Sequence, residues 1–254
     1  MLVQKHLPTQ PHKAPQLHVS LARDEGEVRE AQRLRYQVFA EEMGARLEGA
    51  ENGLDKDIYD PYCDHLLVRD GASNEVVGTY RILAPAQAKR IGGHYSQQEF
   101  DLTRLLHLSD RMVEVGRSCV HPDHRNGATI ALLWNGLAKY MQTHGFDYLM
   151  GCASIGMADG GHVAASLYRR LREKHLSPIE WRVFPRYALP LEHLQDDLDA
   201  AVPPLIKAYL RVGAHICGEP AWDPDFNTAD LLVFLPMAEV SARYARHFLG
   251  QEHI

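Results

Sequence analysis

The segment Arg111–Val120 (RMVEVGRSCV) reads as a strand in which Glu114 and Arg117 stand among apolar residues. Apolar surroundings disfavour the charged form of a carboxyl group, so we expect the pKa of Glu114 to be raised. A carboxylate with such a pKa suits a general base, or a group that positions an amine. The alternative is a buried ion pair between Glu114 and either Arg117 or Arg81.

Arg81 lies in the predicted strand 76–83, which we expect to be a neighbour of the strand 111–120. A guanidinium group offers a planar fork of donors that matches a carboxylate. Either Arg81 or Arg117 could therefore bind the carboxylate of a small substrate. Each could equally pair with a carboxylate of the protein itself, and the sequence leaves this choice open.

An acidic segment spans residues 41–60, with seven acidic and two basic residues and a net charge of −5. Such a segment beside a reaction cleft could attract and select a cationic amine. Asp57 and Asp60 are the candidate binding residues. The alternative is a solvated loop that only aids solubility.

A basic segment follows at residues 166–186, with six basic and two acidic residues and a net charge of +4. It could dock an acidic carrier protein or an anionic membrane surface, or it could be a solvated helix face.

Residues 121–129 form a predicted turn between the strand 111–120 and a long helix. The first turn of a helix has unpaired N–H groups and a positive dipole, which together suit a phosphate group. Glycine permits close approach of the backbone to a ligand. The candidates for binding phosphate are Arg125, Asn126, Gly127, Ala128 and Thr129, although a strand, turn and helix often form a plain connection.

The elements that must hold these residues alternate between strand and helix along the chain, which predicts an α/β fold with a mixed central sheet flanked by helices. We expect a flexible tail over residues 1–15, where three prolines fall, and a single domain over residues 16–254. The predicted strands are 17–22, 65–69, 76–83, 111–120, 146–153, 183–188 and 231–235. The predicted helices are 24–38, 97–108, 130–144, 162–174, 199–212 and 238–249.

Composition narrows the class of protein. A net charge of −6 over 254 residues argues against a general nucleic-acid binder, and 45% hydrophobic residues argue against disorder. The four cysteines are widely spaced, which predicts reduced thiols and a cytoplasmic location. The pair His121 and His124 lacks a supporting carboxylate–histidine cluster, so we expect no metal site.

The order of the elements resembles that of acyl-CoA N-acyltransferases of the GNAT superfamily. The stretch Val120–Ala128 (VHPDHRNGA) is similar to the end of the strand and the pantetheine loop of that superfamily, although it is shorter and holds one glycine. Tyr168 resembles the tyrosine that faces the thiol leaving group in many members. Its alternative is a tyrosine packed between a helix and the sheet.

Several short strings of the sequence resemble particular families more closely. Arg35–Phe39 (RYQVF), followed by Asp57 and Asp60, resembles acyl-homoserine-lactone synthases. Further strings are similar to bacterial ornithine-lipid N-acyltransferases, in the right order along residues 33–248: EEMGA, CDHLLV, VGTYR, EVGRSCV, PLIKAYLR and FNTAD.

This resemblance implies transfer of a 3-hydroxyacyl group from the 4′-phosphopantetheine of acyl carrier protein to the α-amine of L-ornithine, giving lyso-ornithine lipid. The transfer would be direct aminolysis of the thioester, with no permanently bound cofactor. Glu114, Arg117 and Tyr168 would be catalytic, and Asp57, Asp60 and Arg81 would bind the acceptor. Residues 125–129 would bind the phosphopantetheine.

Three alternatives stay open: another amino acid as acceptor, synthesis of an acyl-homoserine lactone, or a non-catalytic module that binds an acyl group or CoA. The acidic segment favours a cationic acceptor. The predicted helix 238–249, with Tyr244 and Phe248, could lie on the inner face of the cytoplasmic membrane as a peripheral contact or pack on the core.

Overall fold

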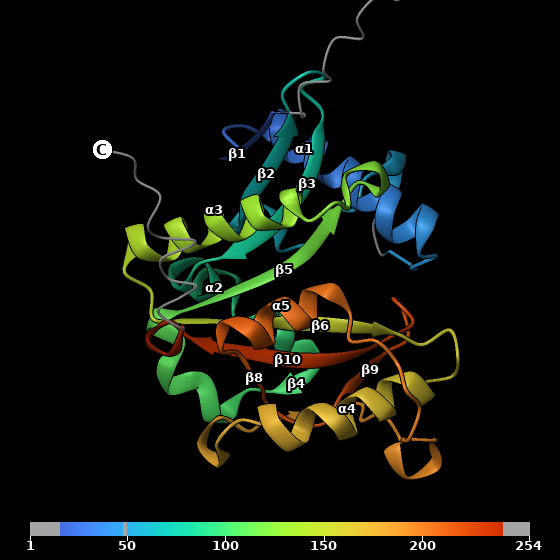
Figure 1. The fold of residues 1–254 in the computed structure, drawn as a ribbon. Helices are drawn as coiled ribbons and strands as arrows, with labels where there is room; N and C mark the ends of the chain where they lie inside the picture. The colour runs from blue at the N-terminus through green and yellow to red at the C-terminus, as the bar shows by residue number, and fades with distance from the viewer. Residues whose placement is uncertain (1–15, 48–49, 241–254) are drawn as a thin grey trace, which may run out of the picture.

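A central sheet organises the protein in the computed structural model, which describes residues 16–47 and 50–240 (Figure 1). Eight strands of this region form the sheet in the order β1-β2-β3-β5-β6-β10-β8, with β9 also paired to β10. They are β1 (Leu17–Leu21), β2 (Asp64–Asp70), β3 (Val76–Leu83), β5 (Met112–Val120), β6 (Tyr148–Gly156), β8 (His215–Ile216), β9 (Ala221–Asp223) and β10 (Thr228–Pro236). The neighbours pair antiparallel except β5 and β6, which are parallel.

Helices cover both faces of this sheet (Figure 1). The helices α3 (Ala128–His144), α4 (His162–His175) and α5 (Pro204–Val212) pack on one face and contribute to the largest apolar core. The other face carries α1 (Glu25–Tyr36), the π-helical turn η1 (Gln37–Glu42) and α2 (Pro85–Ile91), together with a segment that contains η4 (Tyr95–Gln98), β4 (Phe100–Asp101) and η5 (Thr103–Arg111). β4 pairs with β7 (Phe184–Pro185) in a separate small sheet. This second face holds the candidate site.

The strand β5 departs from β6 after a short parallel ladder. The ladder joins only Met112–Glu114 to Tyr148–Met150, and beyond it the two strands separate. Gly151 lies at this point, where an added Cβ would stand 2.2 Å from the carbonyl oxygen of Val115. The glycine therefore permits the close approach of the two backbones just where they begin to diverge.

Gly151→Ala is expected to lower the free energy of unfolding by about 1–3 kcal/mol, because a backbone atom must shift to admit the new methyl group. Gly116→Ala, one strand away, is the matched control, since its added Cβ meets nothing within 4 Å. Urea unfolding of both variants measures the difference. Equal stability of the two variants would contradict this account of the strand contact.

The mixed α/β fold predicted from the sequence is confirmed, including the strands on either side of residues 70–74 and the long helix α3. The predicted helix 97–108 is wrong, because Phe100 and Asp101 pair with β7 and the Asp101 side chain accepts the N–H of Thr103 in a turn. The predicted strand 183–188 shrinks to two residues. The predicted helix 199–212 begins only at Pro204, since proline suits the first helical turn and disfavours helix before it.

Sequence patterns did not identify α2, β8 or β9, which are short elements. Residues 1–15 and 241–254 lie outside the described residues, and with them the predicted tail and most of the predicted helix 238–249. Residues 237–239 form a single 3₁₀ turn. Among the described helices, none is both long and apolar enough to cross a bilayer.

Candidate functional site

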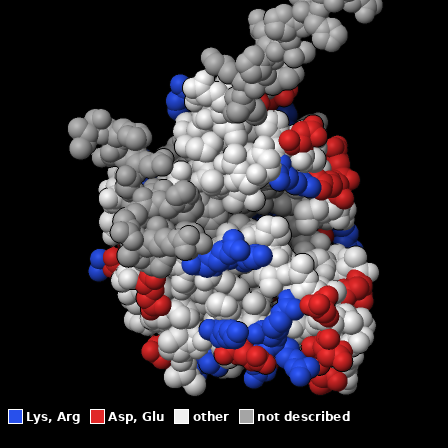
Figure 2. All heavy atoms as spheres, in the orientation of Figure 1, with Lys and Arg blue, Asp and Glu red and all other residues white. Residues whose placement is uncertain are grey.

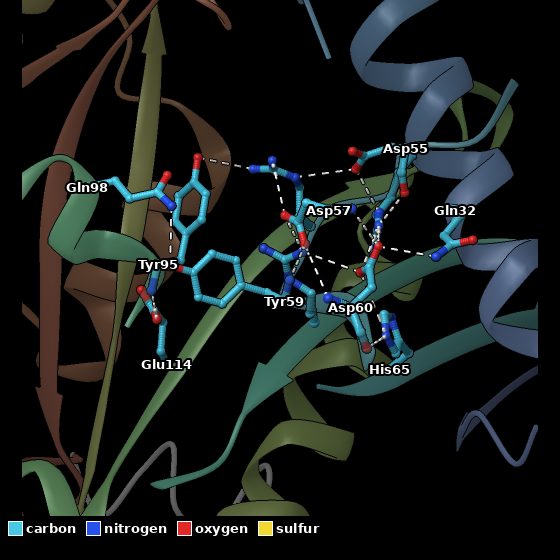
Figure 3. Close-up of polar contacts among 12 residues, drawn as sticks. Gln32, Asp55, Asp57, Tyr59, Asp60, His65, Tyr95, Gln98 and Glu114 are labelled. Atoms are coloured by element: carbon cyan, nitrogen blue, oxygen red, sulfur yellow. Dashed lines mark hydrogen bonds and ion pairs between the residues drawn. The ribbon is translucent and has the colours of Figure 1, made fainter. Parts of the chain in front are cut away.

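A buried ionic network that includes Asp55, Asp57 and Asp60 lies beside α1 (Figure 3), and Arg35 of this helix is at its centre. Its side chain is 0% exposed; Nε donates to Asp55 Oδ2 at 2.8 Å and Nη2 donates to Asp60 Oδ2 at 2.8 Å. Burial would raise the pKa of Asp60, but the charge of Arg35 and then that of Arg81 outweigh burial and hold this pKa well below its usual range. Arg35 therefore keeps the buried Asp60 ionised and also pairs with Asp55.

Arg81 joins the same network from β3. Its Nη1 donates to Asp57 Oδ2 at 2.6 Å and to Asp60 Oδ1 at 3.3 Å. Asp57 in turn accepts the backbone N–H groups of Tyr59 and Asp60, which fixes the loop before η3 (Asp60–Tyr62). Of the two alternatives for Arg81, the structure therefore favours pairing with carboxylates of the protein.

Arg117 occupies a β-bulge, where the pairing of β5 with β3 changes register and where its own φ is +51°. A side-chain-bearing residue in this left-handed region costs about 1–3 kcal/mol, which the surrounding structure must offset. The bulge directs the guanidinium between the rings of Tyr95, at 5.1 Å, and Phe226, at 4.7 Å.

The polar contacts of Arg117 are longer than those of Arg35 or Arg81. Nε lies 3.3 Å from Asp55 Oδ2, Nη2 lies 3.6 Å from Asp57 Oδ2, and Nη1 donates to Tyr95 Oη at 3.4 Å. Its terminal donors are thus less engaged by the protein. Arg117 is the arginine of the three that lines a cavity.

That cavity has a volume of about 1070 Å³. Tyr59, Tyr95, Trp222 and Phe226 supply apolar surface, and the polar part includes the following residues: Asp55, Asp57, Gln98, Glu99, Asp223 and Asp225. Small-molecule sites typically measure roughly 300–1,000 Å³, so this cavity has room for more than an amino acid. Of the sequence-predicted site residues, Asp57 and Arg117 line the cavity. Arg81 is not a lining residue; it forms ion pairs with Asp57 and with Asp60.

Glu114 is buried at the start of the strand separation and holds the first turn of η4. Oε2 accepts the N–H of Tyr95 at 2.7 Å, and Oε1 accepts both the N–H and the hydroxyl of Ser96, at 2.7 and 2.5 Å. His94 Nδ1 lies 3.5 Å from Oε2. Within the described chain, Glu114 forms an ion pair with neither Arg117 nor Arg81, which corrects that alternative.

The expectation of a raised pKa for Glu114 is also wrong. Burial does act to raise the pKa, but His94 and the hydrogen bonds from Ser96 outweigh it, so the pKa lies below its usual value. Apolar neighbours in the sequence do not reveal these donors, which come from residues 18–20 positions away. Glu114 is therefore a weaker proton acceptor than its sequence surroundings indicate.

Glu114→Gln is expected to lower the free energy of unfolding at pH 7 by about 1–3 kcal/mol, because an amide cannot accept all of the N–H and O–H donors. A carboxyl group with a depressed pKa stabilises the fold above its unfolded pKa, near 4.3, and this contribution is lost as pH falls through the folded pKa. The variant should therefore lose less stability than the wild type between pH 5 and the acid limit of folding.

Urea unfolding at pH 7, 5 and 4 measures this difference, with the exposed Glu173→Gln as control. If the free energy of unfolding falls equally in wild type and E114Q as the pH is lowered, the charge of Glu114 contributes nothing to stability.

The residues predicted to bind the acyl donor, 125–129, follow the C-terminal end of β5 and lead into α3. Gly127, with φ +87°, precedes the first residue of α3, and the Asn126 side chain accepts the N–H of Ala128. Arg125 forms two hydrogen bonds with Glu42, at 2.6 and 2.7 Å, on the surface. Thr129 is buried, and its hydroxyl donates to the carbonyl of His124. The described side chains of Arg125 and Thr129 are thus already engaged.

Tyr168 is on α4 in the main apolar core, 4% exposed, on the opposite face of the sheet from the cavity, with Arg172 over its ring. Burial raises the pKa of its hydroxyl. This placement agrees with the alternative in which the tyrosine packs between helix and sheet.

Comparison with known proteins identifies the family. A family model described as an acetyltransferase (GNAT) domain matches residues 34–135. The chain is 38% identical to an L-ornithine N(alpha)-acyltransferase of Agrobacterium fabrum over 92% of the chain and 86% of that protein. It is 40% identical to one of Rhodobacter capsulatus over 91% of the chain and 93% of that protein.

The chain belongs to the L-ornithine N(alpha)-acyltransferase family.

The fold of this family member is similar to that of solved acyltransferases. The acyl-homoserine-lactone synthase LasI superposes with a TM-score of 0.55 at 13% sequence identity, over 95% of this chain and 98% of LasI. An identity this low shows a shared fold alone. The match to the GNAT-domain model and the identity to the curated relatives confirm the sequence resemblance to the GNAT superfamily and to ornithine-lipid N-acyltransferases.

Sequence reasoning missed several residues of this acyltransferase site. Arg35 belongs to the string RYQVF, and sequence reasoning gave it no role of its own. It falls on the buried side of α1 together with Ala31 and Leu34. A charged residue among such apolar positions indicates a buried ion pair. Asp55 was counted only as one acid among seven. Glu99 and Asp230 lie close together near the cavity wall; Glu99 carries no local signal, and Asp230 is part of the string FNTAD without a predicted role.

Proposed function

We propose that this protein transfers an acyl group to the α-amine of L-ornithine. The observation that carries the proposal is the 37–40% identity, over nine-tenths of the chain, to relatives named L-ornithine N(alpha)-acyltransferase. The cavity beside the strand separation is compatible with this function, because it combines a guanidinium group, aromatic walls and carboxylates.

The acceptor carboxylate binds to Arg117 in this proposal. Arg117 lines the cavity with donors whose protein contacts are long, whereas Arg81 is committed to Asp57 and Asp60. A guanidinium–carboxylate contact would orient the amino acid, and the aromatic rings on both sides of Arg117 restrict its motion. Asp57 and Asp60 act by positioning the arginines.

The α-amine then attacks the thioester carbon directly. A C–N bond forms, the C–S bond breaks, and the thiolate takes up the proton released by the amine. An α-amine has a pKa near 8, so a fraction is neutral at pH 7 without a strong base. Glu114, with its lowered pKa and bound donors, acts as a positioning residue that holds the first turn of η4, from which Tyr95 lines the cavity.

The donor is a 3-hydroxyacyl group on the 4′-phosphopantetheine of acyl carrier protein, and the protein needs no permanently bound cofactor. The N-terminus of α3, residues 125–129, would receive the phosphate through backbone N–H groups, which fits the positive φ of Gly127. Tyr168 would assist the thiol only if the donor enters from the α4 face of the sheet.

Basic side chains on the α4 and α5 side of the molecule are the docking surface that we propose for acyl carrier protein (Figure 2). Arg170, Lys207 and Arg211 line a shallow cavity there. Acidic residues interrupt the surface, and Arg169 and Arg170 pair with Asp196 and Asp199. Peripheral contact of a cytoplasmic protein with the inner membrane remains a further proposal, whose predicted helix lies mostly outside the described residues.

The test is to incubate the protein with 3-hydroxyacyl carrier protein and each of several amino acids, and to identify products by mass spectrometry. We expect N-acylornithine, with the matching acyl-CoA a poorer donor. Acylation of another amino acid in the absence of N-acylornithine would refute the proposed acceptor, and turnover with acyl-CoA alone would refute the proposed donor.

A further inference from the structure

Two carboxyl groups and a thiol meet at the wall of the cavity. One oxygen of Glu99, one of Asp230 and the sulfur of Cys152 lie within 4.8 Å of one another. Glu99 follows η4 and lines the cavity, whereas Asp230 on β10 is 4% exposed and is not among the lining residues of the described chain. Glu99 therefore stands between the cavity and Asp230.

The Glu99 carboxyl has a hydrogen-bonding capacity that its surroundings do not use. Both of its oxygens are buried and accept no hydrogen bond from the described residues 16–47 and 50–240. Asp230 accepts a hydrogen bond from the hydroxyl of Thr228 at 2.9 Å. A buried carboxylate without donors or a counter-ion is costly, so this pair of groups is unlike the arginine-linked acids nearby.

A third acidic side chain adds to the negative field. Asp223 lines the cavity beside Glu99, and its Oδ1 accepts the N–H groups of Asp225 and Phe226. Burial, and then the charges of Asp230 and Asp223, raise the pKa of Glu99. Within the described chain, the ion pairs of the region belong to other acids, so none of these three has a cationic partner. This end of the cavity is suited to a cation.

Arg117, Tyr95 and Glu99 line the same cavity. The guanidinium of Arg117 stacks on the Tyr95 ring, and the charges of both Arg117 and Glu99 act on the Tyr95 hydroxyl. The cavity thus has a cationic group and an acidic group that both act on one aromatic residue, Tyr95. An α-amino acid with a terminal amine carries the complementary charges, a carboxylate and a side-chain ammonium.

We propose that Glu99, supported by Asp230, binds the side-chain ammonium of the acceptor while Arg117 binds its carboxylate. This inference rests on the proposed function. A primary ammonium supplies donors for the unused oxygens of Glu99 and a charge for the pair. The proposal places the selection for a side-chain amine at a cluster between η4 and β10. The acidic segment 41–60 is not the site of this selection, because its Asp55, Asp57 and Asp60 are paired with arginines.

Norvaline is the matched probe, because it has the carbon chain of ornithine and lacks the side-chain amine. The experiment compares kcat/KM for ornithine and for norvaline in wild type, Glu99→Gln and the exposed control Glu192→Gln. We expect Glu99→Gln to lower kcat/KM for ornithine by roughly 10- to 100-fold, since a hydrogen bond to a charged group is lost. The value for norvaline should change by less than about threefold, because its contacts do not involve this group.

A binding measurement separates this subsite from a role in proton transfer. Calorimetric titration with ornithine should show weaker binding to Glu99→Gln, with norvaline binding unchanged. Equal loss of kcat for both acceptors would overturn the proposal and make Glu99 a general base. Loss of activity on chelation, restored by Zn²⁺, would overturn it in favour of a metal bound by Glu99, Cys152 and Asp230.

The activity of the wild-type protein tests the proposed function separately: if the wild type forms no N-acylornithine, that function is refuted. An active wild type whose preference for ornithine survives in Glu99→Gln refutes the subsite. Asp230→Asn serves as the second variant if Glu99→Gln does not fold, and it should reduce the same preference. Removal of a buried, unpaired carboxyl should leave the unfolding temperature of Glu99→Gln at or above that of wild type.

Discussion

Arg35→Ala is expected to lower the free energy of unfolding by about 3–5 kcal/mol, the cost of removing one partner from a buried ion pair. Arg35 is 0% exposed and donates to Asp55 and Asp60, both of which are buried. Without it, Asp60 keeps Arg81 and the hydrogen bonds from Gln32 and from the Asp57 N–H, and Asp55 keeps the longer contact with Arg117. Urea unfolding with linear extrapolation at pH 7 measures the loss.

The control for this prediction is Arg29→Ala on the same helix, whose ion pair with Glu25 joins two exposed side chains. Exposed helix pairs contribute about 0.3–0.5 kcal/mol, so the two arginines should differ by several-fold. If Arg35→Ala costs no more than Arg29→Ala, the network under α1 is not what holds residues 55–60 in place. Partial recovery of stability on lowering the pH would support the account, because protons would neutralise the uncompensated buried charge.

Arg117→Ala is expected to reduce kcat/KM for ornithine by about 10²- to 10³-fold, since a charge-assisted, bidentate contact to a carboxylate is removed. The loss should appear chiefly in KM if Arg117 only binds the acceptor, and in kcat as well if it also orients the amine. Stability should change less than in Arg35→Ala, because Arg117 makes only long contacts to Asp55 and Asp57. Steady-state kinetics with saturating acyl donor, alongside thermal unfolding, measure both effects.

Arg117→Lys tests the same residue at constant charge. A lysine keeps the positive charge at the cavity but loses the planar fork of donors, so we expect activity between those of wild type and Arg117→Ala. An alanine variant with wild-type kcat/KM for ornithine would mean that the acceptor carboxylate binds elsewhere. Ornithine amide, which lacks the carboxylate, should be a poor substrate for wild type and should lose little further in Arg117→Ala.

The sequence by itself was enough to predict the fold and the family. Apolar periodicity predicted β1, the hairpin of β2 and β3, and the strand–turn–helix of β5 and α3, because these patterns depend on residues close together in the chain. The strings around Glu114 and Asn227 likewise resembled one family without knowledge of any contact. The short elements α2, β8 and β9 escaped detection, since a few residues carry little periodicity.

The tertiary structure decided which charges are free. Asp57 and Asp60 share the sequence character of solvated acids, yet arginines from α1 and β3, 21–25 residues away, neutralise them. Glu114 has apolar neighbours along its strand, yet donors from η4 lower its pKa, while Glu99 faces Asp230 from 131 residues away and has its pKa raised. Ion pairing and desolvation depend on distance in space, which the spacing along the chain does not determine. The sequence therefore determined the kind of protein, and only the tertiary structure decided which carboxylates can meet a substrate.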